Sequence, residues 1–224
     1  MRALVVGNRG DADPGLVGAR LAEHGFSQEL SEREYPREWK GLAGIDVLLL
    51  LGSDWSVYDV RYKVEVAAEV GLVQAAVARG VPVFGICFGA QLVAHALGGS
   101  VTLSRQPEVG WHAVSSISHT ELLAHDWFQW HYDVFAPPAS LSVVASNDVG
   151  PQAVIGKRLF ATQFHPEVTV EVIRRWCGGT GSLELAQIQK SATSLIEDSA
   201  DNSASLISRT SKLVDWFLNS VSTN

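Results

Sequence analysis

The amino-acid sequence predicts an α/β protein with a central, mostly parallel sheet and helices on both faces. Short, continuous apolar runs alternate with helical patterns over the first hundred of the 224 residues, as is typical of parallel strands that are buried on both faces. Glycine follows most of these segments, as expected where strands and helices end. After about residue 100 the runs become strands separated by turns, which predicts some antiparallel strands.

Three strands and three helices are expected before residue 100. The strands are short apolar runs at Arg2–Gly7, Ile45–Leu51 and Val81–Ile86. The helices have helical spacing followed by glycine, at Pro14–His24, about Tyr62–Arg79 and Ala90–Leu97. Only Cys87, Phe88 and Gly89 separate the third strand from the third helix. The chain must therefore turn sharply there.

The second half of the chain is expected to contain more strands and fewer helices. Strand patterns occur at Val109–Ser118, Leu141–Ser146, Gln152–Ile155 and Leu159–Phe164, and a helix is expected at Thr169–Trp176. These strands are expected to lie in or beside the main sheet.

The C-terminal part of the chain differs in composition. From Thr180 onward Ser and Thr become frequent, and helical spacing predicts two helices, Leu183–Glu197 and Ala204–Leu218. We therefore divide the chain into an α/β domain, residues 1–179, and a helical extension, residues 180–224, that packs on it. Alternatively, apolar side chains of the extension form an interface with a partner or with a second copy in a homo-oligomer.

Composition excludes several classes of function. The net charge of −7 argues against a broad nucleic-acid interface, which needs a basic face. Two cysteines are too few for a disulfide framework, and the N-terminal apolar run is too short for a signal peptide, so we expect a cytoplasmic protein. The uncharged run 80–104 is interrupted by Pro82, Gly85 and Gly89. It is better interpreted as strand, turn and helix than as a membrane span.

The segment Gly85-Ile86-Cys87-Phe88-Gly89 has the form Gly-x-nucleophile-x-Gly between the third strand and third helix. A nucleophile at such a turn adopts a strained backbone that projects its side chain clear of the sheet, and glycine avoids clashes on both sides. The helix N-terminus favours the reactive thiolate of Cys87. The alternative is a buried cysteine in a tight strand-to-helix turn.

A thiolate nucleophile needs an acid–base group, and His165 is the leading candidate. It follows an apolar strand, Pro166 fixes the backbone after it, and Glu167 can turn back to orient its imidazole. His131 is the second candidate, either as a substrate contact or as a buried, hydrogen-bonded histidine. A metal site built from the two histidines with Asp133 and Glu167 matches no standard zinc spacing and would leave Cys87 unexplained. We expect neither a metal nor another cofactor.

These residues carry a resemblance to a known family. Gly-Ile-Cys-Phe-Gly-Ala-Gln at 85–91, followed by Phe-His-Pro-Glu at 164–167, resembles the class I (triad) glutamine amidotransferases. The resemblance runs from about Leu48 to Trp176 and implies their flavodoxin-like fold. Segment 51–59 looks like the family's oxyanion loop. Segments 108–111 and 130–133 look like those of stand-alone members that are similar to the glutaminase domain of GMP synthase.

The resemblance also implies a chemistry. Cys87 attacks the glutamine carboxamide and forms a γ-glutamyl thioester; His165 protonates the departing ammonia and then activates water; Glu167 holds His165. The implied oxyanion hole consists of the N–H groups of Gly52 and Phe88. The implied substrate-binding residues are Gln91, His131, Tyr132 and Asp133.

Two departures from the family pattern bear on the substrate. The segment Leu51-Gly52-Ser53 keeps only one of two usual glycines, and Tyr132 stands where glycine is common and narrows the amino-acid end of the pocket. We expect no ATP-pyrophosphatase domain in this chain, so its ammonia would serve a separate synthetase. The alternatives are a stand-alone γ-glutamyl peptide hydrolase and an inactive binding or regulatory subunit.

Overall fold

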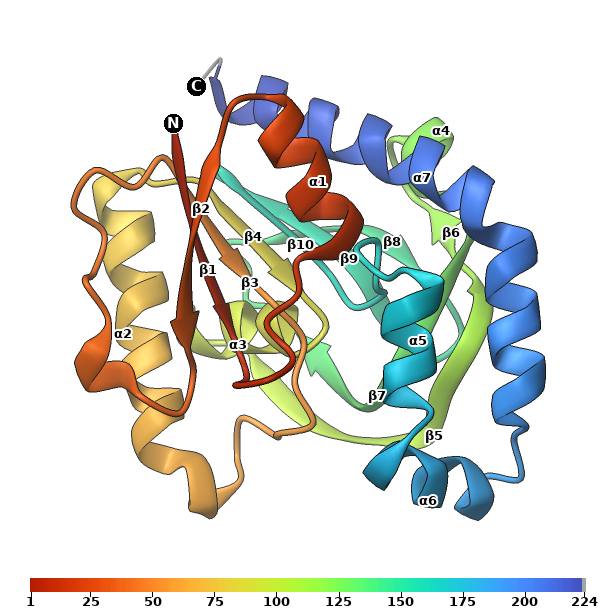
Figure 1. Cartoon of the computed structure of the whole chain (residues 1–224). Helices are drawn as coiled ribbons and strands as arrows, with labels where there is room; N and C mark the ends of the chain where they lie inside the picture. Colours follow the sequence, from red (N-terminus) through yellow and green to blue (C-terminus); the bar gives the residue numbers. More distant parts are fainter. Residues whose placement is uncertain (223–224) are drawn as a thin grey trace.

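The computed structural model describes residues 1–222, whose central sheet has eight strands (Figure 1). Five neighbouring strands are parallel: β2 (Ser27–Glu32), β1 (Arg2–Gly7), β3 (Val47–Leu50), β4 (Val83–Ile86) and β10 (Leu159–Thr162). Three antiparallel strands continue the sheet beyond β10: β9 (Pro151–Gly156), β8 (Ser142–Ser146) and β6 (Ser115–Ser116). β5 (Ser100–Ala113) and β7 (Asp126–Ala136) form a separate antiparallel pair.

Helices cover both faces of the sheet, as the sequence predicts. One apolar cluster packs α1 (Gly15–Glu23), α5 (Val170–Trp176) and α7 (Ala192–Ser222) against one face. A second cluster packs α2 (Lys63–Arg79) and α3 (Phe88–Ala96) against the other. The remaining helices are α4 (Thr120–Leu123), α6 (Gly179–Gln187), η1 (Pro36–Glu38) and η2 (Val60–Tyr62). The predicted α/β class, with antiparallel strands after about residue 100, is confirmed.

The strand order brings three distant segments together. β3, β4 and β10 are adjacent and parallel, so their carboxyl ends lie at the same edge of the sheet. The segments that begin at Leu51, Cys87 and Gln163 all leave the sheet at this edge. In open parallel sheets, ligands bind outside the carboxyl ends of the strands. The topology therefore predicts the place of the site before any side chain is considered.

Two strands lack a clear signal in the sequence. β2 pairs with β1 at one end of the sheet, and its only large apolar side chain, Leu30, is 58% exposed. Its backbone hydrogen bonds make it a strand, although it has no apolar face. β7 was also not predicted, and the strand expected at Val109–Ser118 divides into the long β5 and the two-residue β6.

The prediction of two C-terminal helices at Leu183–Glu197 and Ala204–Leu218 was wrong in its boundaries. The chain breaks near Gln189, whose φ is +55°, so that α6 ends at Gln187 and α7 runs unbroken to Ser222. Residues 198–203, which lie between the two predicted helices, are part of α7. Its inner side is a continuous stripe of buried residues at helical spacing: Leu195, Ser199, Leu206, Thr210, Leu213 and Phe217.

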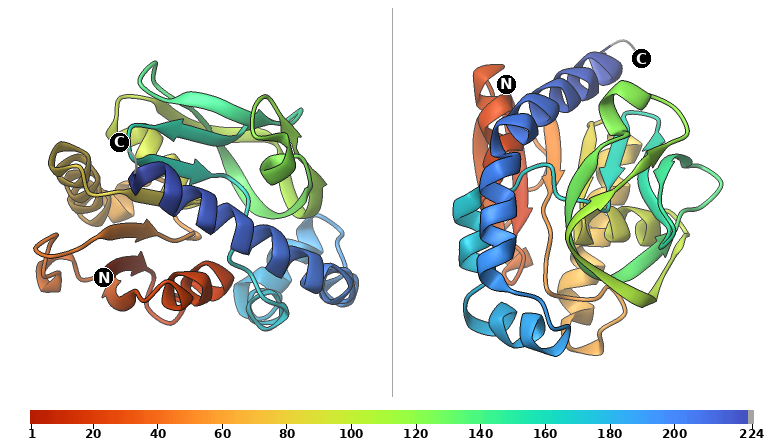
Figure 2. Two further views of the ribbon diagram at one scale, coloured as in Figure 1. Left: turned by 90° about the horizontal axis from the view of Figure 1, so that it is seen from above. Right: turned by 90° about the vertical axis from the view of Figure 1, so that its right-hand side faces the viewer.

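The long helix α7 contributes to the main core. It packs against α1 and α5, and Figure 2 shows it running along the outside of that face from α6 to the C-terminal end. The division into a domain of residues 1–179 and an extension remains a prediction. Among residues 1–222 no helix is long and apolar enough to cross a membrane.

Candidate active site

A cavity of about 550 Å³ opens at the carboxyl ends of β3, β4 and β10. All but one of the residues that the sequence singled out line it: Gly52, Cys87, Gln91, His131, Tyr132, Asp133, His165 and Glu167. The exception, Phe88, is fully buried directly after Cys87. Sequence segments more than a hundred residues apart therefore meet at one opening.

The Cys87 turn has the strained geometry that the sequence predicts. Cys87 has a φ of +52°, although it is not glycine, and it precedes the first residue of α3. A side chain at position 85 would lie 2.8 Å from the Gly89 carbonyl oxygen, and one at position 89 would lie 2.3 Å from the Leu50 oxygen. Both flanking positions must therefore be glycine.

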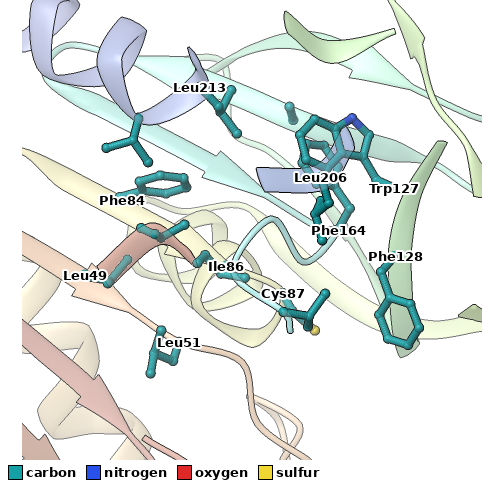
Figure 3. Packing of buried hydrophobic residues seen from close by; sticks show 14 of the residues in the cluster. Leu49, Leu51, Phe84, Ile86, Cys87, Trp127, Phe128, Phe164, Leu206 and Leu213 are labelled. Carbon is teal, nitrogen blue, oxygen red and sulfur yellow. The ribbon is translucent and has the colours of Figure 1, made fainter. Parts of the chain in front are cut away.

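The Cys87 sulfur lies between the apolar core and the cavity. Figure 3 shows Cys87 beside Ile86 at the border of the apolar cluster, and only 3% of the residue is exposed. The Gln163 Nε2 donates to the sulfur at 3.7 Å, and the Trp130 carbonyl oxygen is 3.8 Å away. The sulfur is thus reached through the cavity and has a donor that stabilises its thiolate form.

The imidazole of His165 is oriented by Glu167. Its Nδ1 lies 2.7 Å from the Glu167 Oε1, and both side chains are buried. No residue in the described part of the chain forms a standard hydrogen bond with its Nε2. This is the arrangement of an acid–base histidine that is fixed at one nitrogen and available at the other.

Neighbouring charges favour the protonated form of this imidazole. Burial alone would lower the pKa of His165, but the negative charges of Glu167 and Cys87 outweigh it and raise that pKa well above its ordinary value. Cys87 and His165 line the same cavity, and both lie next to Gly52. The surroundings thus favour an imidazolium at His165.

Distant elements hold the segment from His165 to Glu167. The His165 N–H donates to the Phe128 carbonyl of β7, and the Leu16 N–H of α1 donates to the Glu167 carbonyl. The Thr210 hydroxyl of α7 donates to the Pro166 carbonyl at 2.6 Å. Three elements that are remote in sequence therefore fix three successive residues.

Gly52 lies directly against Cys87 and His165. A side chain at position 52 would begin 3.0 Å from the His165 Cε1 and 3.6 Å from the Cys87 Cβ. Only glycine fits there without displacing the imidazole.

The remaining predicted residues form a hydrogen-bonded wall. The Gln91 Nε2 donates to the Asp133 carbonyl and to the Gln163 Oε1, both at 3.3 Å. The Asp133 carboxylate accepts from the hydroxyls of Ser56 and Tyr58, each at 2.6 Å. The loop after β3 is thus tied to β7 across the cavity.

His131 is buried and already engaged at both ring nitrogens. Its Nδ1 lies 2.9 Å from the Asp133 carbonyl and its Nε2 lies 3.1 Å from the Glu108 Oε2. Burial alone would raise the pKa of Glu108, but the hydrogen bond and charge of His131, with the charge of His112, lower it. This agrees with the expectation of a buried, hydrogen-bonded histidine better than with a direct substrate contact.

Tyr132 faces a part of the wall that the sequence did not indicate. Glu184 of α6 accepts from the Trp130 indole at 2.9 Å. Burial and the nearby Glu184 carboxylate raise the pKa of Tyr132 to about 12, while its hydroxyl has no hydrogen-bond partner among the described residues. Residues 178–181, at the start of α6, line the same side of the cavity. Nothing in the local sequence of α6 suggested this, because glycine and serine there are also typical of a linker.

Two further features of this region are its metal-ligating side chains and the second cysteine. No group of three or more metal-ligating side chains occurs within residues 1–222. Cys177 is free and lies in the apolar core behind the cavity, where burial raises the pKa of its thiol. Cys87, by contrast, accepts a hydrogen bond from the Gln163 amide and lines the cavity.

Comparison with known proteins agrees with this fold and site. The family model for class I glutamine amidotransferases matches residues 19–174, more than half of the chain. The chain therefore belongs to the class I glutamine amidotransferase family.

Curated relatives narrow the resemblance. The GMP synthase [glutamine-hydrolyzing] of Bdellovibrio bacteriovorus is 33% identical over 172 residues, which cover 75% of this chain and 33% of that protein. The GMP synthase of Vibrio atlanticus is 40% identical over 99 residues, which cover 40% of this chain and 19% of that protein. The chain thus spans about a third or less of these relatives.

Solved structures share the fold over nearly the whole chain. A glutamine amidotransferase of Thermotoga maritima superposes with a TM-score of 0.87 at 23% identity, covering 97% of both chains. That of Methylobacillus flagellatus has a TM-score of 0.84 at 23% identity, covering 98% of this chain and 94% of that chain. The coverage includes the C-terminal helices, which lie outside the family match.

Proposed function

We propose that this chain hydrolyses the side-chain amide of glutamine through a thioester on Cys87. One observation carries the proposal. A cysteine on a strained strand-to-helix turn and an imidazole held by a carboxylate share one cavity with the backbone of Gly52. Nucleophile, acid–base group and oxyanion donors are the parts that acyl transfer requires.

The steps follow from the roles we assign. The Cys87 thiolate attacks the carboxamide carbon, and the N–H groups of Gly52 and Phe88 stabilise the resulting oxyanion. When the carbon–nitrogen bond breaks, the His165 imidazolium gives its proton to the departing ammonia. The imidazole, still held by Glu167, then takes a proton from water as that water attacks the thioester, and glutamate leaves.

The wall of β7 is proposed to bind the amino-acid end of the substrate. Gln91 holds Gln163 against the sulfur, and the carboxylate of Asp133 faces the cavity with lone pairs to spare for an ammonium group. His131 acts through the Asp133 carbonyl. The Tyr132 hydroxyl in this wall has no hydrogen-bond partner among the described residues, so it is available to the substrate.

The amine that leaves the γ-carbonyl group, either ammonia or the amino group of a second amino acid, defines two versions of this function. Similarity to GMP synthases supports delivery to a separate synthetase. Tyr132, which lines the cavity where glycine is common in the family, favours a γ-glutamyl peptide hydrolase as a second candidate.

A substrate comparison tests the proposal. The purified chain is supplied with glutamine or with γ-glutamyl dipeptides, and ammonia and glutamate are measured. Release of ammonia from glutamine supports the glutaminase, and release of glutamate from dipeptides alone supports the hydrolase. In both cases Cys87→Ala should abolish turnover while Cys177→Ala leaves it intact. Turnover that survives in Cys87→Ala would refute the mechanism.

A further inference from the structure

A buried arginine lies directly behind the proposed oxyanion hole. Arg33 follows the carboxyl end of β2 and is 0% exposed, as is its ion-pair partner Glu69 of α2. Its Nε and Nη2 donate to the two Glu69 carboxylate oxygens at 2.7 and 3.1 Å. The two side chains form a bidentate ion pair in the protein interior. The best-attested role of such a buried pair is to specify one local geometry.

The remaining donors of Arg33 contact the backbone of the loop after β3. Its Nη2 donates to the Leu51 carbonyl at 3.0 Å, and its Nη1 donates to the Gly52 carbonyl at 3.0 Å and to the Asn8 Oδ1 at 2.6 Å. All five N–H donors of the guanidinium are thereby used. Two successive carbonyls of the loop point at one fixed group.

This contact fixes the direction of an N–H group. The Leu51 carbonyl and the Gly52 N–H belong to the same planar, trans peptide, in which they point in opposite directions. Because Arg33 holds that carbonyl on the core side, the Gly52 N–H is directed to the other side. Gly52 lines the cavity there, close to Cys87 and His165.

The same guanidinium also supports the second proposed donor. Its central carbon lies 4.5 Å from the centre of the Phe88 ring, which is fully buried. The ring therefore packs on a cation that is itself immobile. One buried group contacts both residues whose N–H groups would bind the oxyanion.

We propose that Arg33, held by Glu69, is a positioning residue that aligns the Gly52 and Phe88 N–H groups for the oxyanion. The inference rests on the proposed function and assigns no contact between Arg33 and substrate. Because Glu69 neutralises the charge, Arg33 acts by orienting the donors. Its removal should slow the step that forms the oxyanion and leave glutamine binding and the sulfur's own reactivity largely unchanged.

The test uses the double variant Arg33→Met/Glu69→Met, because removing Arg33 alone would leave Glu69 buried without a partner. Steady-state rates with glutamine are compared with alkylation of Cys87 by iodoacetamide, a displacement that forms no oxyanion. We expect kcat to fall roughly 10²-fold or more, as when an oxyanion donor is lost. KM and the alkylation rate should stay within about threefold of wild type, a range expected when no transition-state contact is removed.

Two controls separate alignment from general damage. Arg20→Met removes another bidentate arginine, which pairs with Asp215 far from the cavity, and should keep full activity. Arg33→Lys keeps the charge but cannot bridge both carbonyls, so its kcat should also fall. Unchanged kcat in the double variant, or alkylation that falls in parallel with kcat, would overturn the proposal. Failure of the proposed function looks different, since wild type itself would then turn over neither substrate.

Discussion

The Cys87 turn and the His165–Glu167 loop meet at one cavity, but the molecule fixes them in different ways. The turn depends mainly on the two glycines beside Cys87, because Gly85 permits the close approach of the Gly89 carbonyl and Gly89 permits that of the Leu50 carbonyl of β3. The loop is held from outside, by Phe128, Leu16 and Thr210. A local motif can therefore be recognised from a short stretch of sequence, whereas the loop's position depends on the whole fold.

Among variants that keep the Cys87 nucleophile, the largest effect is expected from Glu167→Gln, which removes the loop's charge and leaves the Cys87 turn untouched. The amide no longer stabilises the imidazolium, so kcat should fall roughly 10⁴-fold, as when other catalytic histidines lose their carboxylate. The pKa of His165 should fall with it. Because departing ammonia needs a protonated imidazole, the alkaline limb of the kcat profile should move to lower pH.

The same variant makes a prediction about stability. The raised pKa of His165 means that its protonation stabilises the fold fully below the unfolded-state pKa of about 6.5, and that this stabilisation is lost as pH rises through the folded-state pKa. Chemical denaturation of wild type and Glu167→Gln should therefore differ more below pH 6.5 than at high pH. The exposed Glu171→Gln is the control. Equal differences at all pH values would argue against the charge interaction.

Gly89→Ala breaks the Cys87 turn instead. The new methyl group would lie 2.3 Å from the Leu50 carbonyl oxygen, so the backbone must shift. We expect a loss of about 3 kcal/mol in the free energy of unfolding, the upper part of the range for overpacking. Gly71→Ala is the matched control, because its side chain meets open space on α2 and should stabilise by about 0.5 kcal/mol or more. Urea denaturation measures both, and a stable Gly89→Ala variant would show that the turn is less constrained than the contacts indicate.

Thr210→Val tests the remote support of the loop and should have the smallest effect. It keeps the shape of the side chain but leaves the buried Pro166 carbonyl without its hydroxyl donor. The expected cost is about 1 kcal/mol in unfolding free energy. A several-fold loss of kcat should accompany it if α7 positions His165. Thr102→Val, at an exposed position of β5, should change neither quantity. If kcat is unaffected in Thr210→Val, α7 supports the fold but not the loop.

The same contrast explains what could be predicted from the sequence. The apolar strands, the glycines around Cys87 and the Phe-His-Pro-Glu segment have local signals, and the structure places them together at the cavity. Arg33 has no such signal, since it stands between two acidic residues in a polar stretch that resembles an exposed loop. Its burial follows from the pairing of β2 with β1 and from Glu69, which is 36 residues away.

Other residues were missed for related reasons. Gln163 follows β10 directly and lies two residues before His165. Its contact with the Cys87 sulfur nevertheless depends on the adjacency of β4 and β10. Glu184 reaches the cavity because α6 packs beside α5 and faces Trp130 of β7. Sequence patterns report burial and local conformation, while these contacts depend on which elements become neighbours.

The most direct measurement of the central claim is detection of the acyl-enzyme. The protein is mixed with excess glutamine, quenched in acid within the first turnovers, digested and analysed by mass spectrometry. The account predicts one glutamyl group on the peptide that contains Cys87, none on Cys177, and none in Cys87→Ala. Ammonia release without any adduct on Cys87, or with an adduct on a different residue, would contradict it.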